Sequence, residues 1–190
     1  MAPDRPSVAP DLSASARLRY RRLTPDDAAF LVVLVNSPDW LAYIGDRGVR
    51  TEADARVYLA DKIFSAMTAP EFGPYAMCLR DDGTPIGTVG IYARAGLDVP
   101  DLGFALLPAY IGQGYGEVGA RAVLGFAEIA DSRQQRREIT ALSAISDPRN
   151  AASAGLLRKL GFRQNGTVVL PGETQALSRW AWRSSIADLP

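Results

Sequence analysis

The sequence contains no histidine and only one cysteine in 190 residues. Without histidine, no imidazole can serve as a general base, as a member of a catalytic triad or as a metal ligand. The single cysteine, Cys78, excludes a disulfide within the chain and, with histidine absent, a Cys/His zinc site. Cys78 lies in the apolar run from Tyr75 to Leu79, so we interpret it as a buried apolar residue and not as a nucleophile. We therefore expect no metal, and acid–base chemistry must come from carboxylates, tyrosine, serine, water or backbone groups.

The chain also lacks an excess of charge and a long hydrophobic run. It has 21 basic and 21 acidic residues, which gives no electrostatic reason to expect a nucleic-acid or membrane partner. No stretch approaches the roughly 20 continuous apolar residues that span a bilayer. Residues 1–16 are rich in Pro, Ala and Ser and lack the apolar segment of a signal peptide. We expect them to form a frayed tail of a cytoplasmic protein that is a monomer or a homodimer.

The patterning between residues 17 and 183 predicts one mixed α/β domain, followed by a short tail at 184–190. Three consecutive strands in its middle look antiparallel, so the expected fold is a single, largely antiparallel sheet flanked by helices. Apolar periodicity and turn signals predict strands at 17–23, 75–80, 86–92, 102–107, 138–144, 164–170 and 175–183. N-cap and apolar patterns predict helices at 24–35, 51–67, from the glycine-rich segment described next to about 130, and at 150–160.

A glycine-rich loop connects the strand ending at Leu107 to the helix that follows. Its three glycines at alternate positions allow a sharp turn and expose backbone N–H groups. At a helix N-terminus, where the macrodipole adds partial positive charge, such donors form a seat for a phosphate or pyrophosphate. The loop consists of Ile111, Gly112, Gln113, Gly114, Tyr115 and Gly116.

Two other interpretations of this loop are open. Gly114 to Gly119 matches the dinucleotide pattern G-x-G-x-x-G and has Glu138 downstream, as in NAD(P)-dependent oxidoreductases. Against this, the motif follows three antiparallel strands, and only two strand–helix pairs remain for a doubly wound sheet. The glycines can also serve only a tight strand–helix connection.

A second motif lies about 30 residues further on. Asn150 and Ser153 occupy the first turn of a predicted helix on one face, and Leu156 to Phe162 reads Leu-Leu-Arg-Lys-Leu-Gly-Phe. With the glycine loop, this segment resembles the GNAT N-acetyltransferases, and more narrowly the RimJ/RimL branch. The opening at 18–28 and the segment Gly87 to Gly90 resemble that branch as well. Asn150 taken alone is equally well explained as an N-cap.

The resemblance implies the corresponding fold and acetyl-CoA, or another acyl-CoA, as cofactor. In the family the loop matching Ile111 to Gly116 wraps the pyrophosphate, and the strand matching Phe104 to Leu106 pairs through its backbone with the pantetheine and acyl amides. Ile111 departs from the Gln, Arg or aromatic residue usual in the family, and Leu157 stands where many relatives have a tyrosine that protonates the leaving thiolate. The expected cofactor contacts are Phe104, Ala105, Leu106, Ile111, Gly112, Gln113, Gly114, Tyr115, Gly116, Asn150 and Ser153.

N-acetyl transfer requires a neutral amine, and deprotonating a lysine-like amine of pKa ~10.4 at neutral pH costs about 4–5 kcal/mol. With histidine absent, the candidate bases are Asp101, Asp46 and Glu52, or an ordered water relay. The N–H of Leu106 is the expected donor to the developing oxyanion. Ser153 is the nearest hydroxyl for the leaving thiolate, although a plain helix-surface role explains it too.

Four residues are expected to line the acceptor pocket: Trp40, Tyr43, Asp46 and Glu52. Asp46 can instead pair with Arg47 or Arg50, and Glu52 can complement a helix dipole. The sequence thus predicts an N-acetyltransferase acting on a primary amine of a peptide or protein N-terminus or of a small molecule. The alternatives are a non-catalytic acyl-CoA-binding domain and an NAD(P)-dependent oxidoreductase.

Overall fold

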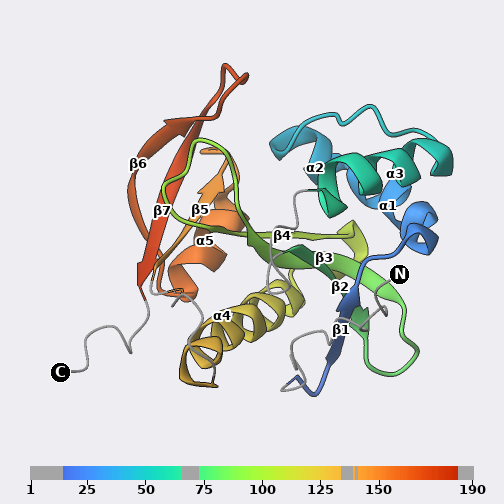
Figure 1. Cartoon of the computed structure of the whole chain (residues 1–190), viewed down its shortest axis with the longest axis horizontal. Helices are drawn as coiled ribbons and strands as arrows, with labels where there is room; N and C mark the ends of the chain where they lie inside the picture. Colours follow the sequence, from blue (N-terminus) through green and yellow to red (C-terminus); the bar gives the residue numbers. More distant parts are fainter. Residues whose placement is uncertain (1–14, 66–72, 134–138, 140, 184–190) are drawn as a thin grey trace, which may run out of the picture.

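The computed structural model describes residues 15–65, 73–133, 139 and 141–183 (Figure 1). The expected tails at 1–16 and 184–190 therefore lie outside the described residues, except for Ser15 and Ala16. The strands are β1 (Leu18–Arg22), β2 (Gly73–Leu79), β3 (Pro85–Tyr92), β4 (Asp101–Leu106), β5 (Ala141–Ser146), β6 (Arg163–Val169) and β7 (Ala176–Arg183). The helices are α1 (Ala28–Val35), α2 (Pro38–Tyr43), α3 (Glu52–Tyr58), α4 (Tyr115–Arg133) and α5 (Ala151–Lys159), with short turns η1 (Pro25–Asp27), η2 (Leu59–Phe64) and η3 (Pro108–Tyr110).

All seven strands belong to one sheet in the order β1-β2-β3-β4-β5-β7-β6. Every neighbouring pair is antiparallel except β4 and β5, which are parallel. The expected mixed, largely antiparallel sheet is confirmed. A doubly wound parallel sheet, which the dinucleotide interpretation requires, is not formed by the described strands.

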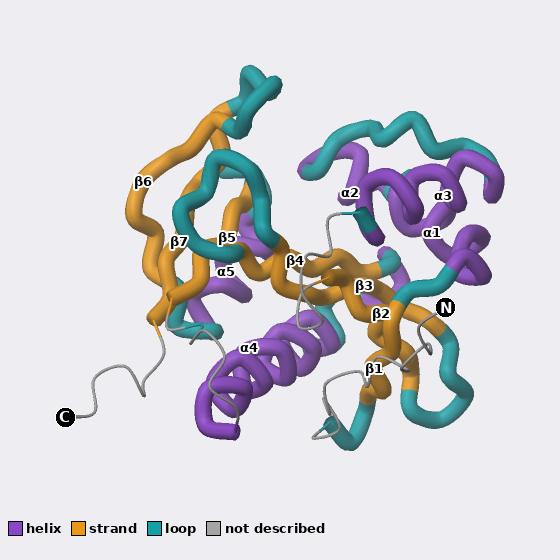
Figure 2. Tube along the Cα trace, viewed as in Figure 1, coloured by secondary structure: helices purple, strands orange, loops and turns teal. Residues whose placement is uncertain are grey.

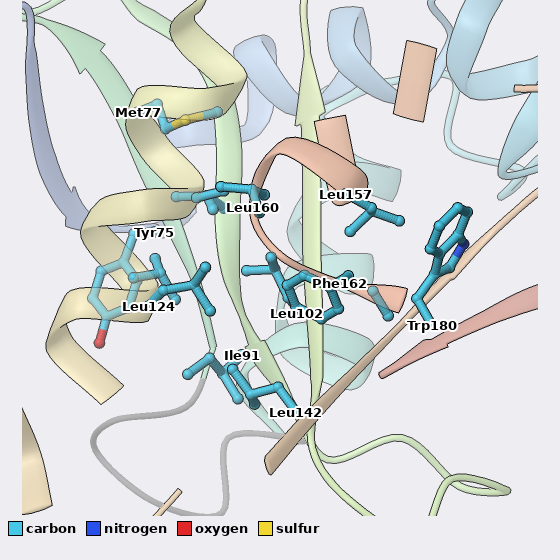
Figure 3. Packing of buried hydrophobic residues seen from close by; sticks show 14 of the residues in the cluster. Tyr75, Met77, Ile91, Leu102, Leu124, Leu142, Leu157, Leu160, Phe162 and Trp180 are labelled. Carbon is cyan, nitrogen blue, oxygen red and sulfur yellow. The ribbon is translucent and has the colours of Figure 1, made fainter. Parts of the chain in front are cut away.

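Alternating side chains of β2 divide the core between the two faces of the sheet. Tyr75 and Met77 join the larger cluster under α4 and α5 (Figure 3), and Ala76 and Cys78 join the cluster under α1 and α3. Figure 2 shows α4 apart from α1 and α3, which lie together on the other side of the strands. Cys78 is 3% exposed, which confirms that it is a buried apolar residue.

Most predicted element boundaries lie within two residues of the observed ones, and three segments call for comment. β5 ends at Ser146, two residues beyond the predicted strand at 138–144, of which residues 138 and 140 lie outside the described residues. The predicted helix at 51–67 is α3 followed by the wider turn η2, and residues 66 and 67 lie outside the described residues. The predicted helix at 24–35 ends at Val35 as expected, and the residues after it, to which no element was assigned, form α2. Ser37 in an extended conformation, Pro38 at the first helical position and Asp39 in the first turn start this helix, because proline fixes a helical φ and lacks only an N–H that would be unpaired anyway.

Candidate functional site

The centre of the sheet is interrupted between β4 and β5. These two strands pair in register only at Asp101 and Ser143, where the N–H of Ser143 donates to the carbonyl of Pro100 at 2.8 Å. Beyond that point, Gly103 to Leu106 are all partly exposed, although β4 is the fourth of seven strands. Partial exposure in a central strand means that β5 does not cover this side of β4 there.

The alternation of backbone hydrogen bonds along β4 shows which of its N–H and C=O groups face this interruption. The N–H of Leu107 donates to the carbonyl of Ile86 at 2.8 Å, so Leu107 is one of the residues whose backbone groups point to β3. In an antiparallel pair this orientation alternates along the strand. Ala105 therefore directs its N–H and C=O to β3, whereas Phe104 and Leu106 direct theirs to the interrupted side.

The glycine loop lies directly after β4 and begins α4. Gly112 and Gly114 have φ of +79° and +82°, a region that side-chain-bearing residues rarely adopt. The first bond of α4 runs from the N–H of Val118 to the carbonyl of Gly114 at 3.1 Å, so the three preceding N–H groups have no acceptor within the helix. A Cβ added at Gly112 would have no neighbour within 4 Å, which shows that the space beside it is open.

Gly116 is the point where β4, α4 and α5 meet. A Cβ at this buried position would lie 3.2 Å from Leu156 Cδ2 and 3.5 Å from Leu106 Cδ1. The absence of a side chain lets the start of α4 approach the end of β4 and α5. The loop and the outward-facing backbone of β4 therefore form one continuous surface.

Asn150 and Ser153 begin α5 as the sequence predicts. The Asn150 side chain accepts a hydrogen bond from the N–H of Ser153 at 2.9 Å, which is the N-cap role; both residues are partly exposed. Leu157 is 1% exposed and packs in the core with Phe162 and Trp180 (Figure 3). A hydroxyl for a leaving group must therefore come from elsewhere than residue 157.

Asp101 lies at the parallel junction of β4 and β5. Its side chain is 1% exposed and forms an ion pair with Arg94, whose Nε is 3.1 Å from Oδ2. Burial raises the pKa of Asp101, and the ion pair with Arg94 acts in the opposite direction. A carboxylate whose pKa is raised is a better proton acceptor than an ordinary surface aspartate.

Arg149 joins α2 to the loop after β5. It donates to the carbonyl of Ala42 at 3.0 Å and forms an ion pair with Asp147 at 2.7 Å; the Asp147 side chain is 1% exposed. Gln175 donates to the same carboxylate at 2.7 Å. Hydrogen bonds from Arg149 hold the pKa of Asp147 well below its usual range. This network fixes the end of α2 against the start of α5. From the sequence, Arg149 was a weak candidate for contact with the CoA phosphates, and Asp147 and Gln175 were not predicted as site residues.

The four residues predicted to line the acceptor pocket have different surroundings in the structure. Tyr43 lies close enough to Arg149 for an electrostatic interaction, and the indole N–H of Trp40 is buried without a hydrogen-bond partner among the described residues. Asp46 pairs with Arg50 at 2.5 Å, and hydrogen bonds from Arg50 lower its pKa to about 2. Glu52 pairs with Arg56 along α3 at 2.9 Å. The structure thus brings Tyr43 to Arg149 beside the start of α5, packs Trp40 against the core cluster under α1 and α3, and gives both carboxylates local basic partners.

A model of the acetyltransferase (GNAT) domain matches residues 17–163. The chain belongs to the GNAT acetyltransferase family. It is an N-acetyltransferase, and its acetyl donor is acetyl-CoA. The uncharacterized N-acetyltransferase YnaD of Bacillus subtilis is 26% identical over 152 residues, which are 79% of this chain and 81% of that protein.

Solved structures share the fold of this GNAT enzyme. AAC(6′)-Ib in complex with paromomycin and acetyl-CoA superposes with a TM-score of 0.69 at 22% identity, covering 90% of this chain and 96% of that chain. RimL, a ribosomal L7/L12 alpha-N-protein acetyltransferase, superposes with a TM-score of 0.70 at 15% identity, covering 90% and 92% of the two chains. Within the described part of this enzyme, none of the helices has the length and apolar character needed to cross a membrane.

Proposed function

We propose that this enzyme transfers the acetyl group of acetyl-CoA to a primary amine of a peptide or protein N-terminus or of a small molecule, by direct attack of the amine. The observation that supports this best is the outward-facing backbone of Phe104 and Leu106 beside the glycine loop. An extended arm that carries amide groups can pair with such a half-strand as a further strand would. Bound acetyl-CoA supplies a pantetheine arm of this kind, a pyrophosphate and an activated thioester.

The proposed cofactor contacts follow the surface described above. The N–H groups of residues 112–117 face the pyrophosphate with the dipole of α4 behind them. Phe104 and Leu106 contact the pantetheine amides through their backbone. Ala105 is left out of the backbone contacts because its N–H and C=O are directed to β3. Asn150 keeps its side-chain NH₂ for the arm, since only its oxygen is used by the N-cap.

Strand geometry decides which backbone donor can serve the carbonyl oxygen. Asp101 and Leu106 are five residues apart in β4, so their Cα atoms are separated by about 16 Å at about 3.3 Å per residue. They cannot both act on one acetyl carbonyl. Phe104, about 10 Å from Asp101 on the same count, is within reach of a carbonyl that an amine attacks near Asp101. We therefore assign the oxyanion donor to the N–H of Phe104 in place of Leu106.

Asp101 is proposed to accept the proton of the acceptor ammonium through one ordered water, because its carboxylate is buried and paired with Arg94. Ser153 is proposed to donate a hydrogen bond to the departing thiolate, a role that the buried Leu157 cannot fill. Asp46 has a lowered pKa and is exposed, so it is unsuited to take a proton. It can only attract a cationic acceptor.

The acceptor is proposed to lie between α2 and the start of α5, where Tyr43 meets the Arg149 network, and Trp40 is proposed to line the same pocket from α2. Asp46 and Glu52 are proposed to lie on the outer wall, where Arg50 and Arg56 offset part of their negative charge. Of the two structural neighbours described above, one is solved with paromomycin and the other is a ribosomal-protein acetyltransferase, which supports testing both acceptor classes. Membership of the RimJ/RimL branch and a cytoplasmic location stay predictions.

The test measures free thiol release from acetyl-CoA with three acceptor panels: peptides with free N-termini, aminoglycosides and polyamines. Products are confirmed by the mass increase of one acetyl group. We expect calorimetric CoA binding and turnover with at least one panel, and no thermal stabilisation by NADPH. CoA binding without turnover on any amine would favour a binding domain, and the absence of CoA binding would refute the proposal.

A further inference from the structure

The glycine loop of this chain has no positive charge of its own. Residues 111–116 contain no basic side chain, and Ile111 stands where the family resemblance leads one to expect a polar, basic or aromatic residue. The first acidic residue of α4, Glu117, adds a negative charge, which is balanced by Arg121 at 3.0 Å. Arg121 also donates to the carbonyl of Lys159 at 3.1 Å, so its guanidinium is bound to Glu117 and Lys159 and not to residues 111–116. The N–H groups and the helix dipole offer a pyrophosphate only partial positive charge, so a full positive charge on the loop comes from another part of the chain.

Arg17, which directly precedes β1, places its guanidinium on this loop. Its Nη1 donates to the carbonyl of Gln113 at 2.9 Å, and its Cζ lies 4.0 Å from the ring centroid of Tyr115. The same Nη1 is 3.6 Å from the position that a Cβ of Gly114 would occupy. The guanidinium therefore lies against Gln113, Gly114 and Tyr115, within the segment whose N–H groups are proposed to face the pyrophosphate.

The backbone of Arg17 is held firmly enough to position this side chain. Its N–H donates to the Oγ of Ser15 at 3.2 Å, and its carbonyl accepts from the N–H of Arg80 at 3.1 Å. The contact joins residues 96 positions apart in the sequence. A guanidinium has five N–H donors, and the bond to Gln113 uses one of them, so the exposed side chain retains donors for phosphate oxygens.

We propose that Arg17 is a cofactor-binding residue, which supplies to the phosphates of acetyl-CoA the positive charge that the glycine loop lacks. This proposal rests on the proposed function of the loop as the pyrophosphate seat. Stacking on Tyr115 and the bond to Gln113 preorganise the guanidinium, so its charge is available without the loss of side-chain entropy that a free arginine would suffer.

The test compares Arg17→Gln with the wild type, and Arg19→Gln serves as the matched control because it removes the same charge from an exposed residue two positions away. CoA affinity is measured by calorimetry at several NaCl concentrations, and pantetheine, which has no pyrophosphate, is measured by ligand-observed NMR. We expect Arg17→Gln to bind CoA about tenfold more weakly and with a smaller dependence on salt. Its affinity for pantetheine should be unchanged, and Arg19→Gln should resemble the wild type in both assays.

A purely structural role is distinguished by the salt dependence. If Arg17 only shaped the loop, Arg17→Gln would lose affinity without a change in the salt dependence, and that result would overturn the proposal. So would an unchanged affinity for CoA. Arg17→Lys, which keeps the charge but not the planar fork, should retain the salt dependence even if it binds more weakly, and it provides a second variant if Arg17→Gln unfolds. Absence of CoA binding by the wild type would instead refute the proposed function itself.

Discussion

Replacing Gly114 with glutamate tests the pyrophosphate seat most directly. Gly114 has φ of +82°, so any side chain there costs roughly 1–2 kcal/mol of backbone strain. The added carboxylate would stand beside Arg17 and could pair with it, because Nη1 is 3.6 Å from the Cβ position. At a separation of about 5 Å and an effective dielectric constant of about 20, each phosphate charge would be repelled by about 3 kcal/mol. One such term alone corresponds to a loss of CoA affinity of about 100-fold.

Gly172→Glu is the matched control for this variant. Gly172 has φ of +81°, lies in the turn between β6 and β7 and has no neighbour within 4 Å of its Cβ position, so strain and added charge are the same. Both variants should lose similar thermal stability, measured by circular dichroism. Only Gly114→Glu should lose CoA binding in calorimetry. If Gly114→Glu bound CoA within threefold of the control, the loop would not hold the pyrophosphate.

Three further variants test the base, the acceptor wall and the packing. Asp101→Asn should lower kcat about 100-fold. It should also remove the increase in activity that the wild type shows as the pH rises through the raised pKa of this carboxyl, whereas Asp98→Asn, an exposed control, should keep the wild-type pH profile. Arg149→Gln should raise the acceptor KM more than the acetyl-CoA KM, because α2 loses its bond to the loop before α5; an effect on acetyl-CoA alone would contradict this. Gly90→Ala should cost about 3 kcal/mol in urea denaturation because its Cβ would clash with the Gly73 backbone, whereas Gly125→Ala should gain about 1 kcal/mol in the open interior of α4. Equal stability of the last two would refute the packing argument.

Local patterns predicted most of the secondary structure because they depend on neighbouring residues. The continuous apolar run from Tyr75 to Leu79 predicted the strand, and the turn residues Asp81 to Gly83 predicted the connection to the next strand, whereas the division of β2 between the two faces was seen only in the structure. The end of β5, two residues beyond the predicted end, is a tertiary effect, since its register is set by pairing with β7 and not by its own composition. α2 was not predicted although Ser37-Pro38-Asp39 has the same start signal as Thr24-Pro25-Asp26, because a proline just after a helix is also a common stop signal.

The candidate site also has a part that local patterns predict and a part that depends on contacts between distant residues. The glycine loop could be predicted because three alternating glycines beside a helix start allow positive φ, which Gly112 and Gly114 adopt, and expose N–H groups within a few residues. The contacts of Arg17 with Gln113 and of Arg149 with Ala42 join residues 96 and 107 positions apart. Sequence periodicity does not indicate contacts between residues so far apart, and with 21 basic residues the composition does not identify which of them make such contacts. The Asp147–Arg149 pair had a local signal, an i,i+2 pair around Pro148, but its link to α2 depends on the fold.

The interruption between β4 and β5 connects the stability of the fold with its chemistry. If the sheet were continuous, the backbone groups of Phe104 and Leu106 would form hydrogen bonds with the next strand. Leaving them exposed to water forgoes about 0.5–1.5 kcal/mol of stability for each hydrogen bond. In the proposed function this cost has a purpose, because a sheet closed at its centre would have no edge for an amide-bearing arm to pair with. Asp101 and Ser143 hold the strands together at one end, and Gly116 brings α4 and α5 together near the other. The opening is therefore fixed at both ends before the cofactor arrives, so that binding energy need not be spent on separating the strands.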